Sequence, residues 1–494
     1  MPIAIIVACT GEDPDGTAGN VDAGRGETGD AAVDGDTRPL GPVVNDRYQA
    51  GQRLRPNFLE VSGESQFLDW YDAEREVHCT FRLATDNQLR CLPDVPVTVA
   101  PGDFADAACS VRVAREPAGC AGTPRFVGVA QGCTTRIFAT KGPATTSYQR
   151  VQGGGCERQP TAGGSQLGDE TDPAIWVRGV VEESAEDTGP VRAEILRGDD
   201  GSSGFRRWKP RTLATECTWQ AGLNSALHCI PRKLVTAAGF TDAACSTALF
   251  ATVVDACDPP IVGERRTFVT ERCVSRLTAT EYRELDGAYA GSSYFLEDGT
   301  CRPQGNVTGT KAGTALDVEA TFGSAELLRV PTSGRLAGLF ARFPGGARAR
   351  IGWYDTLLDA PCEVGPAMDG SLRCLPMAPT AATMTFTDRA CTAPTTAAYV
   401  APKAVIDCQL PGRTCPTDCA LPEKPRFVSA PLAGGCRQQR RRIYALGSVA
   451  QGPIFIKPEL AAAVCREANR GDEAVYSVTE QSATDLVAAT PTIP

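Results

Sequence analysis

Short runs of alternating apolar and polar residues recur along the chain and predict β-strands rather than helices. Helical spacing is rare. The best helix candidate is 458–467, where Pro458 suits the first turn and Leu460 and Val464 lie on one face. The strands predicted for the first third of the chain are 53–61, 67–72, 79–83, 89–92, 110–114, 125–130, 136–139 and 148–151. The pattern therefore predicts an all-β protein.

One set of landmarks occurs three times, at intervals of roughly 140 residues, which indicates tandem repeats. In each unit a tryptophan lies nine residues before a first cysteine, a second cysteine follows twelve residues later, and a proline comes two residues after that. A Phe-x-Asp-x-Ala-Cys segment follows. The landmarks are Trp70, Trp208 and Trp353; Pro93, Pro231 and Pro376; and Phe104, Phe240 and Phe386. We divide the chain into unit 1 (46–188), unit 2 (189–330) and unit 3 (331–494).

Each unit holds about eight predicted strands in two sets of four. Three such units would build a six-bladed β-propeller of double blades, and the alternative is a row of three separate β-domains. A propeller must close, and the apolar segments 474–478 and 485–489 could complete a sheet with the first strands after Arg47.

The chain has 21 cysteines, a number typical of proteins from an oxidising compartment. Each unit contributes six, an insertion in unit 3 adds two, and Cys9 is left alone. The simplest prediction joins neighbours within a unit: first to second, third to fourth and fifth to sixth, although six cysteines allow fifteen connectivities. The first two should oppose each other in a hairpin, with Asp369-Gly370 at its turn in unit 3. The predicted disulfide cysteines are Cys79, Cys91, Cys109, Cys120, Cys133, Cys156, Cys217, Cys229, Cys245, Cys257, Cys273, Cys301, Cys362, Cys374, Cys391, Cys408, Cys415, Cys419, Cys436 and Cys465.

Metal binding is the alternative use of these cysteines. Zinc sites usually combine Cys-x-x-Cys spacing with histidines, whereas this chain has only His78 and His228, each beside a predicted disulfide cysteine. Cys415 and Cys419 are the best metal candidates, and a small disulfide loop explains them as well. We predict no metal site and no cofactor.

The N-terminus resembles the end of a bacterial lipoprotein signal peptide. Ile6, Val7, Ala8 and Cys9 match its cleavage motif, which makes Cys9 the candidate lipidation site. Residues 1–9 lack the basic and long apolar parts of a working signal, so we interpret them as a truncated one; an ordinary terminus with a stray thiol is the alternative. Residues 10–45 are acidic and glycine-rich, which predicts a disordered linker.

Net charge and hydropathy limit which binding partners we expect for this chain. The net charge of −10 offers no general attraction for nucleic acid, and no apolar run is long enough to span a membrane. We therefore expect membrane contact only through a lipid anchor, and the oligomeric state stays open. The acidic stretches 169–172 and 182–187 lack the ligand spacing of a calcium loop and are expected to be exposed linkers between units.

No catalytic constellation is recognisable, and we predict no catalytic residue. Motifs for Ser-His-Asp hydrolases, zinc proteases and P-loops are absent. Three aspartates that recur at one register position should cap turns, and four neighbouring arginines in unit 3 are expected on a solvated strand face. These residues are Asp106, Asp242 and Asp388, and Arg437, Arg440, Arg441 and Arg442.

One position departs from the threefold repeat. Asp72 of unit 1 matches Asp355 of unit 3, but unit 2 has Pro210 there, preceded by Lys209 in place of a tyrosine. A functional asymmetry could begin at this departure, and drift of one repeat is the plainer explanation.

The segments Trp-Tyr-Asp, Leu-Arg-Cys-Leu-Pro and Phe-x-Asp-x-Ala-Cys resemble those of uncharacterised cysteine-repeat lipoproteins of myxobacteria. This resemblance implies residence at the cell surface, in the outer membrane or in the periplasm, or secretion, and it implies no activity. We expect a surface-tethered or periplasmic binding or structural module with an unknown envelope ligand. The alternative is a carbohydrate-active or other hydrolase that uses a carboxylate pair in a propeller channel.

Overall fold

The structure is a computed structural model. It describes residues 42–94, 99, 102–115, 124–151, 154–160, 164–186, 188–222, 226–251, 257, 259–271, 274–297, 299–378, 384–392, 394–396, 425–432, 440–450, 452–456, 465–468 and 475–492.

Each unit begins with a four-stranded antiparallel meander that carries the tryptophan and the first two cysteines. Alternation along these strands places the tryptophan and the cysteines on one face, where they are buried. The four strands predicted for this part of unit 1 are all present. The meanders are β2 (Leu54–Val61), β3 (Glu64–Asp72), β4 (Val77–Leu83) and β5 (Leu89–Pro93); β14 (Val191–Gly198), β15 (Ser203–Pro210), β16 (Cys217–Ala221) and β17 (Leu227–Pro231); and β24 (Leu336–Arg342), β25 (Arg348–Asp355), β26 (Ala360–Pro366) and β27 (Leu372–Pro376).

Three connecting strands join the meanders into a closed ring. β13 (Arg178–Glu183) pairs with both β5 and β14. β23 (Glu326–Pro331) pairs with β24, and Ala325 just before it bridges Leu227 of β17. β35 (Ala489–Thr492) pairs with β2, and Ala488 bridges Arg373 of β27. The hydrogen-bonded path thus returns to its first strand.

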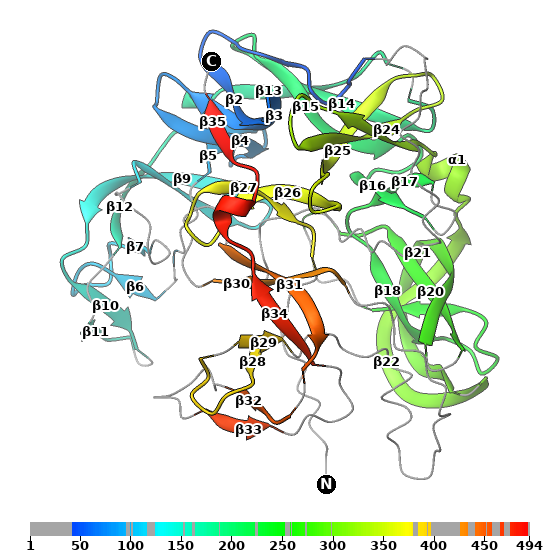
Figure 1. Cartoon of the computed structure of the whole chain (residues 1–494). Coiled ribbons are helices and arrows are strands. Elements are labelled where there is room, and N and C mark those ends of the chain that lie inside the picture. Colours follow the sequence, from blue (N-terminus) through cyan, green and yellow to red (C-terminus); the bar gives the residue numbers. More distant parts are fainter. Residues whose placement is uncertain are drawn as a thin grey trace.

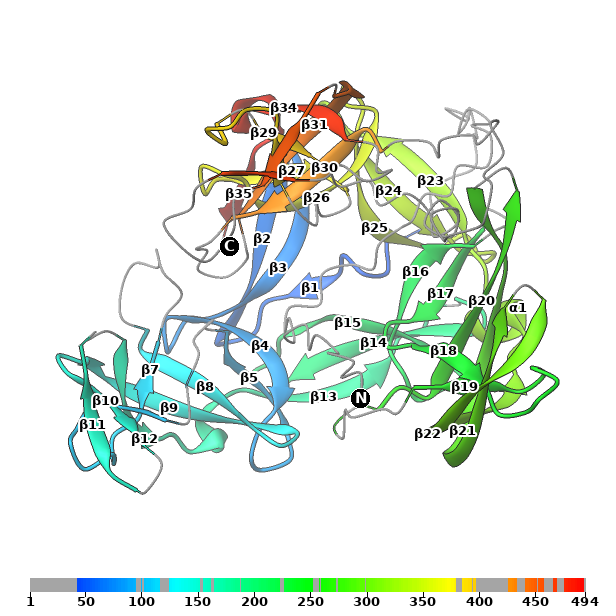
Figure 2. The same cartoon turned by 90° about the horizontal axis from the view of Figure 1, so that it is seen from below.

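Buried clusters fill the inside of the ring at its three corners. The disulfide and tryptophan of unit 2 pack against apolar side chains at the start of unit 3, and those of unit 3 pack against Leu59 and Val61 of β2. In unit 1 they pack with Tyr48 and Val177. Tyr48 belongs to the short β1 (Tyr48–Gln49), which pairs with β15 and lies among the three meanders (Figure 2).

The second half of each unit forms a separate β-rich arm on one side of the ring (Figure 1). The arm of unit 1 has two small sheets, that of unit 2 is a closed barrel with one 24-residue strand, and that of unit 3 is a seven-stranded sheet. Their strands are β6 (Asp103–Phe104), β7 (Val113–Ala114), β8 (Phe126–Gln131), β9 (Thr134–Pro143), β10 (Ser147–Arg150), β11 (Cys156–Gln159) and β12 (Ser165–Glu170); β18 (Val235–Phe240), β19 (Ala248–Phe250), β20 (Val262–Glu271), β21 (Val274–Glu297) and β22 (Thr300–Ala315); and β28 (Met384–Phe386), β29 (Pro394–Thr396), β30 (Phe427–Pro431), β31 (Arg441–Val449), β32 (Ile454–Ile456), β33 (Arg466–Ala468) and β34 (Tyr476–Glu480).

This arrangement confirms the all-β class and agrees with separate β-domains rather than propeller blades. The meanders join edge to edge, whereas propeller blades would stand side by side around a channel. Closure onto the first strands does occur, but the strand that makes it, β35, shares only Ala489 with the predicted segment 485–489, and Asp485 lies in a helical turn. The segment that contains β34 instead pairs with β31 and β29 inside the arm.

A capped helical turn leads from each arm into its connecting strand. The turns are η1 (Pro173–Ile175), α1 (Val318–Phe322) and η2 (Ala483–Asp485), capped by Asp172, Asp317 and Ser482. In each unit the residue before the second cysteine donates a hydrogen bond to the carbonyl of the turn's C-cap. The pairs are Arg90 with Trp176 (2.7 Å), His228 with Gly323 (2.6 Å) and Arg373 with Leu486 (3.1 Å).

Seven disulfides staple the described residues. Cys79–Cys91, Cys217–Cys229 and Cys362–Cys374 lie in the hairpins, but the two cysteines are offset by two residues: Cys79 faces Pro93, and Cys91 faces Phe81. The third cysteine of each unit pairs with the sixth, not with the fourth as neighbour pairing predicted, in Cys109–Cys156, Cys245–Cys301 and Cys391–Cys465. Cys133 of unit 1 pairs with Cys257 of unit 2, which links two arms. These disulfides indicate an extracellular or periplasmic protein.

The repeated aspartates build the turn that positions the third cysteine. Asp242 accepts hydrogen bonds from the backbone N–H of Ala244, Ser246 and Thr247, at 2.7–3.1 Å. Asp106 and Asp388 make the same kind of contact in the other units. The cysteine that follows adopts a positive φ of 51–54° in all three units, which the aspartate-capped turn imposes.

Two other predictions differ from the structure. In the acidic segment 182–187, Glu182 and Glu183 are exposed as expected, but they lie in β13, a paired strand that connects units 1 and 2 rather than an irregular linker. Most of the predicted helix 458–467 lies outside the described residues, and Glu467 at its end lies in β33.

Candidate functional site

An ion pair clamps the first meander to its capped turn. Asp72 is fully buried and accepts hydrogen bonds from Arg53 Nε (2.7 Å) and Nη2 (2.5 Å). Arg53 Nη1 also donates to the carbonyl oxygen of Ile175 in η1. Unit 3 repeats the clamp with Arg335, Asp355 and the carbonyl of Asp485. In unit 2 the two clamp positions are Pro190, directly before β14, and Pro210 at the end of β15.

Beside the clamp of unit 1 lies an open cleft of about 630 Å³. Its lining includes Gln52, Arg53, Ala73, Glu74, Ala174, Trp176, Val177, Asp199 and Asp200. Trp176 forms the buried floor, and the guanidinium of Arg75 stacks over its ring at 5.2 Å. The cleft therefore combines an aromatic floor with charged walls.

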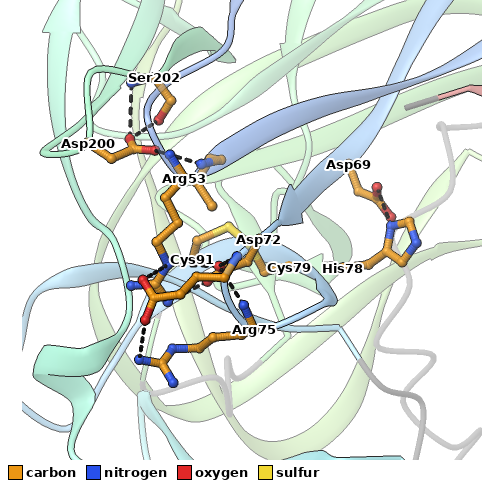
Figure 3. The surroundings of a disulfide bond; sticks show 11 residues. Arg53, Asp69, Asp72, Arg75, His78, Cys79, Cys91, Asp200 and Ser202 are labelled. Atoms are coloured by element: carbon orange, nitrogen blue, oxygen red, sulfur yellow. Dashed lines mark hydrogen bonds and ion pairs between the residues drawn. A yellow bond between two sulfur atoms is a disulfide. The ribbon is translucent and has the colours of Figure 1, made fainter. Parts of the chain in front are cut away.

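The carboxylates of the cleft are engaged in structural hydrogen bonds. Asp200 accepts from the backbone N–H of Arg53 and Leu54 and from Ser202, as Figure 3 shows. Burial opposes the ionisation of Asp200, but the hydrogen bonds from Leu54 and Ser202 keep its pKa below the usual range. Asp199 accepts from the backbone N–H of Arg178, and Glu74 lies 3.4 Å from Arg53 Nε.

A second polar cluster lies on the face of β3 and β4 opposite the disulfide. The buried Asp69 accepts from Asn57 Nδ2 (2.8 Å) and contacts His78 Nδ1 (3.0 Å). This orients the imidazole as a carboxylate orients a catalytic histidine. Thr80 follows Cys79 on β4, one step beyond the Trp70–Cys79 pair, and its hydroxyl has no hydrogen-bond partner among the residues that the structure describes. The nucleophile-to-histidine hydrogen bond of a hydrolytic triad is therefore not formed by Thr80.

A β-bulge places this cluster, and it recurs in all three meanders. The bulged residue is two positions before the tryptophan: Leu68, Arg206 and Ile351. The cross-strand pair next to the bulge is Asn57 with Asp69 in unit 1, Glu194 with Arg207 in unit 2, and Leu339 with Gly352 in unit 3. One backbone feature thus presents three different chemistries, as bulges near functional sites do.

Several predicted residues lie outside the described part of the chain. They are Cys9, Cys120, Cys273, Cys408, Cys415, Cys419, Cys436 and Arg437. Two arginines of the basic cluster predicted in unit 3 contact acids: Arg441 forms an ion pair with Glu363, and Arg442 lies 3.8 Å from Glu480. Within the described ranges no group of three or more His, Cys, Asp or Glu side chains could hold a metal ion, and no helix is long and apolar enough to cross a membrane.

Sequence reasoning missed the bulges and the arginines of the clamps. A bulge shifts the strand register by one residue, and the alternation pattern of a short strand is too noisy to reveal it. The clamp was visible in principle, because Arg53 and Arg335 hold matching places nineteen and twenty residues before the paired aspartates.

Comparison with known proteins gives a family but no activity. No curated protein matches the chain. Residues 178–468 match a family of unknown function. The match begins at the first residue of β13 and ends in β33, so it covers the meander of unit 2, its arm and most of unit 3. More than half of the 494 residues are included, and the chain therefore belongs to the family of unknown function DUF7481.

Proposed function

We propose that this protein is a bacterial envelope-binding module, tethered at the cell surface or in the periplasm by a lipid on Cys9. The ring would act as a rigid scaffold, and its bulge sites and arms would present the binding surfaces. Residues 10–45 would serve as the flexible linker between the lipid and the ring.

One observation carries the choice of a module over an enzyme. Asp72, Asp200 and Asp355 are buried or half-buried carboxylates that hold backbone N–H groups or an arginine; Asp355 does so through Oδ1, while its Oδ2 is buried away from solvent. A hydrolytic carboxylate pair needs oxygens that can reach a substrate and two different pKa values. The aspartates of the cleft and of the clamps instead act as fixed parts of the scaffold.

The hydrolase alternative rests on the exposed acids of the cleft. Glu74 has 62% of its side-chain surface exposed and lines the cleft, as Asp199 does. If the cleft hydrolyses glycosides, Glu74→Gln and Asp199→Asn should each abolish release of a chromogenic aglycone. Turnover that is unaffected by either change, or no turnover at all, leaves the binding module as the function.

Binding can be tested with isolated cell envelopes. The purified protein, residues 42–494, is sedimented with outer-membrane and peptidoglycan fractions, and bound protein is measured against bovine albumin as the control. We expect saturable retention that a reduced and alkylated sample loses, because the ring depends on its disulfides. Retention no greater than that of albumin would overturn the proposal.

The tether has its own test. The chain is expressed with its natural upstream region, and intact mass is measured before and after thiol alkylation, with and without reductant. We expect a diacylglycerol on Cys9 and twenty cysteines that react only after reduction. An unlipidated chain with free thiols would contradict both the anchor and the compartment.

A further inference from the structure

The face of the second meander opposite Trp208 carries a concentrated positive charge, although the whole chain has a net charge of −10. Strand alternation places Arg207 and Lys209 of β15 on that face, with Arg192 and Glu194 opposite them on β14. The bulge adds Arg206. We call this group the unit 2 basic face; it comprises Arg192, Arg206, Arg207, Lys209, Arg211 and Arg232, with Glu183, Glu194 and Glu216 among them.

Its centre is a single carboxylate shared by three cations. Glu194 is 6% exposed and lies 2.6 Å from Arg207 Nε, 3.1 Å from Arg206 Nη1 and 3.7 Å from Lys209 Nζ. Burial opposes the ionisation of Glu194, but these cations hold its pKa below the usual range. One buried carboxylate is therefore shared by three positive charges, of which Arg206 is also attracted by Glu216.

Neighbouring contacts do not remove the excess. Glu183 pairs with Arg192 and lies 3.8 Å from Arg211, and Glu216 lies 3.4 Å from Arg232. Six cations thus surround three carboxylates. Arg192 directly faces Lys209 across the two strands, an arrangement of like charges that destabilises a sheet. The buried Nε of Arg192 has no acceptor among the described residues.

The face is specific to unit 2. Where unit 2 has Glu194, Arg206, Arg207 and Lys209, unit 1 has Asn57, Leu68, Asp69 and Tyr71, and unit 3 has Leu339, Ile351, Gly352 and Tyr354. The fold therefore does not require these cations, because two of its three copies are built without them. A costly charge that the fold does not need is expected to serve a ligand.

We propose that the unit 2 basic face binds a phosphate ester group, with Arg206 and Lys209 as its principal donors and Arg207 held in place by Glu194. Guanidinium and ammonium groups favour phosphate oxygens, and a dianionic group would offset most of the excess of six cations over three carboxylates. This inference rests on the proposed binding function and names the chemistry of its ligand. The phosphate could be part of a soluble molecule or of a lipid headgroup.

The test compares the wild type with Arg206→Gln/Lys209→Gln, and uses Arg197→Gln as the matched control. Arg197 lies on the same strand pair and forms an exposed ion pair with Glu182, away from Glu194. Binding of glycerol phosphate is measured by calorimetry, with glycerol as the blank. Binding to phosphatidylcholine vesicles with and without phosphatidylglycerol is measured by flotation.

We expect glycerol phosphate to bind the wild type and the control alike, and the double variant to bind it about tenfold more weakly. If the wild type also binds vesicles with phosphatidylglycerol, and the double variant binds them more weakly, the phosphate belongs to a lipid headgroup. If phosphatidylglycerol does not increase binding over phosphatidylcholine vesicles alone, the phosphate belongs to a soluble ester. Equal affinity of wild type and double variant, or no phosphate binding, overturns the inference. Arg206→Gln alone, which leaves Arg207 and Lys209 on Glu194, replaces the double variant if that one unfolds.

The experiments distinguish a wrong assignment of the phosphate site from a wrong proposal of envelope binding. If the double variant still sediments with cell envelopes as the wild type does, the module stands and its ligand site lies elsewhere. If the wild type itself does not sediment with envelopes, the proposed function fails, whatever the result with glycerol phosphate.

Discussion

The corner where the first two strands of each meander meet the capped turn is fixed in one way in units 1 and 3 and in another way in unit 2. In units 1 and 3 an arginine before the first strand of the meander reaches a buried aspartate at the end of the second strand, and also a carbonyl of the capped turn. In unit 2 prolines stand at both positions: Pro190 directly before β14, and Pro210 at the end of β15, where it faces Val191. The same backbone hydrogen bond closes the corner in every unit, from residue 73, 211 or 356 to residue 53, 190 or 335.

The difference shows that the clamp is a device for fixing a corner rather than a reaction centre. Proline restricts φ in the unfolded chain and so stiffens a corner without any charge. An ion pair achieves the same result only if both partners are present, because one buried charge alone is costly. Unit 2 has proline at both positions, so neither a lone arginine nor a lone aspartate is left there.

The largest effect is expected from breaking one clamp. Asp72→Ala leaves Arg53 without its partner and should lower the free energy of unfolding by about 3–5 kcal/mol. Pro210→Ala at the equivalent site should cost about 1 kcal/mol or less. Denaturant titrations compare the two. The double variant Arg53→Met/Asp72→Leu should be more stable than Asp72→Ala, and a double variant that is less stable would refute the clamp as an interdependent pair.

Removal of a hairpin disulfide should cost about 3 kcal/mol in any unit, since each closes a loop of the same length. Unit 2 has prolines at the two positions where units 1 and 3 have the buried arginine–aspartate clamp, so Cys217→Ser/Cys229→Ser should also open the hairpin to a protease most readily. Limited proteolysis of this variant and of Cys79→Ser/Cys91→Ser measures the difference. Equal cleavage of both would mean that the prolines hold the corner as firmly as the clamp.

His228 of unit 2 donates to the C-cap carbonyl of its turn, as Arg90 and Arg373 do in the other units. Substitutions of His228 test whether the three contacts are equivalent. His228→Ala leaves the carbonyl of Gly323 without its donor and should cost about 1–3 kcal/mol. His228→Arg restores the residue found in the other units and should stay within about 1 kcal/mol of the wild type. Thermal unfolding of both variants checks this, and an arginine variant as unstable as the alanine variant would show that the three positions are not equivalent.

The smallest effect concerns pH. Hydrogen bonds from the backbone N–H of Thr247 and Ser246 lower the pKa of Asp242 to about 2. Because the folded pKa lies below that of the unfolded chain, the turn's contribution to stability is fully present above about pH 4. It is lost as the pH falls through about 2. An NMR titration of the Asp242 carboxyl carbon measures the value, and an ordinary aspartate midpoint would contradict the capped turn.

The sequence was informative where the repeat was strong. The landmarks around Trp70, Trp208 and Trp353 predicted the strands of the meander, the repeated aspartates predicted capped turns, and the last apolar residues predicted closure onto the first strands. These features are local, so short-range patterns record them.

The remaining features depend on contacts between distant residues. The role of β13 as a bridge between β5 and β14 was missed because its acidic residues resemble a linker, whereas Glu182 and Glu183 are neutralised by Arg197 and Arg192 on the next strand. The link between the third and sixth cysteines brings together residues 47–74 apart in sequence, and spacing cannot rank such pairings. For the candidate sites, the sequence marked unit 2 as different at Lys209 and Pro210 but did not reveal the bulge that gathers Arg206 and Arg207 around Glu194.

The pairing of β35 with β2 also governs how the molecule is made. The hydroxyl of Thr492 donates to the carbonyl of Phe58, 434 residues away in sequence, so the first sheet has an open edge until β35 has been synthesised. Closing so large a loop is slow, and an exposed strand edge invites aggregation in the meantime. We therefore expect deletion of β35 (Ala489–Thr492) to lower the yield of folded protein more than the small buried area of this strand would suggest.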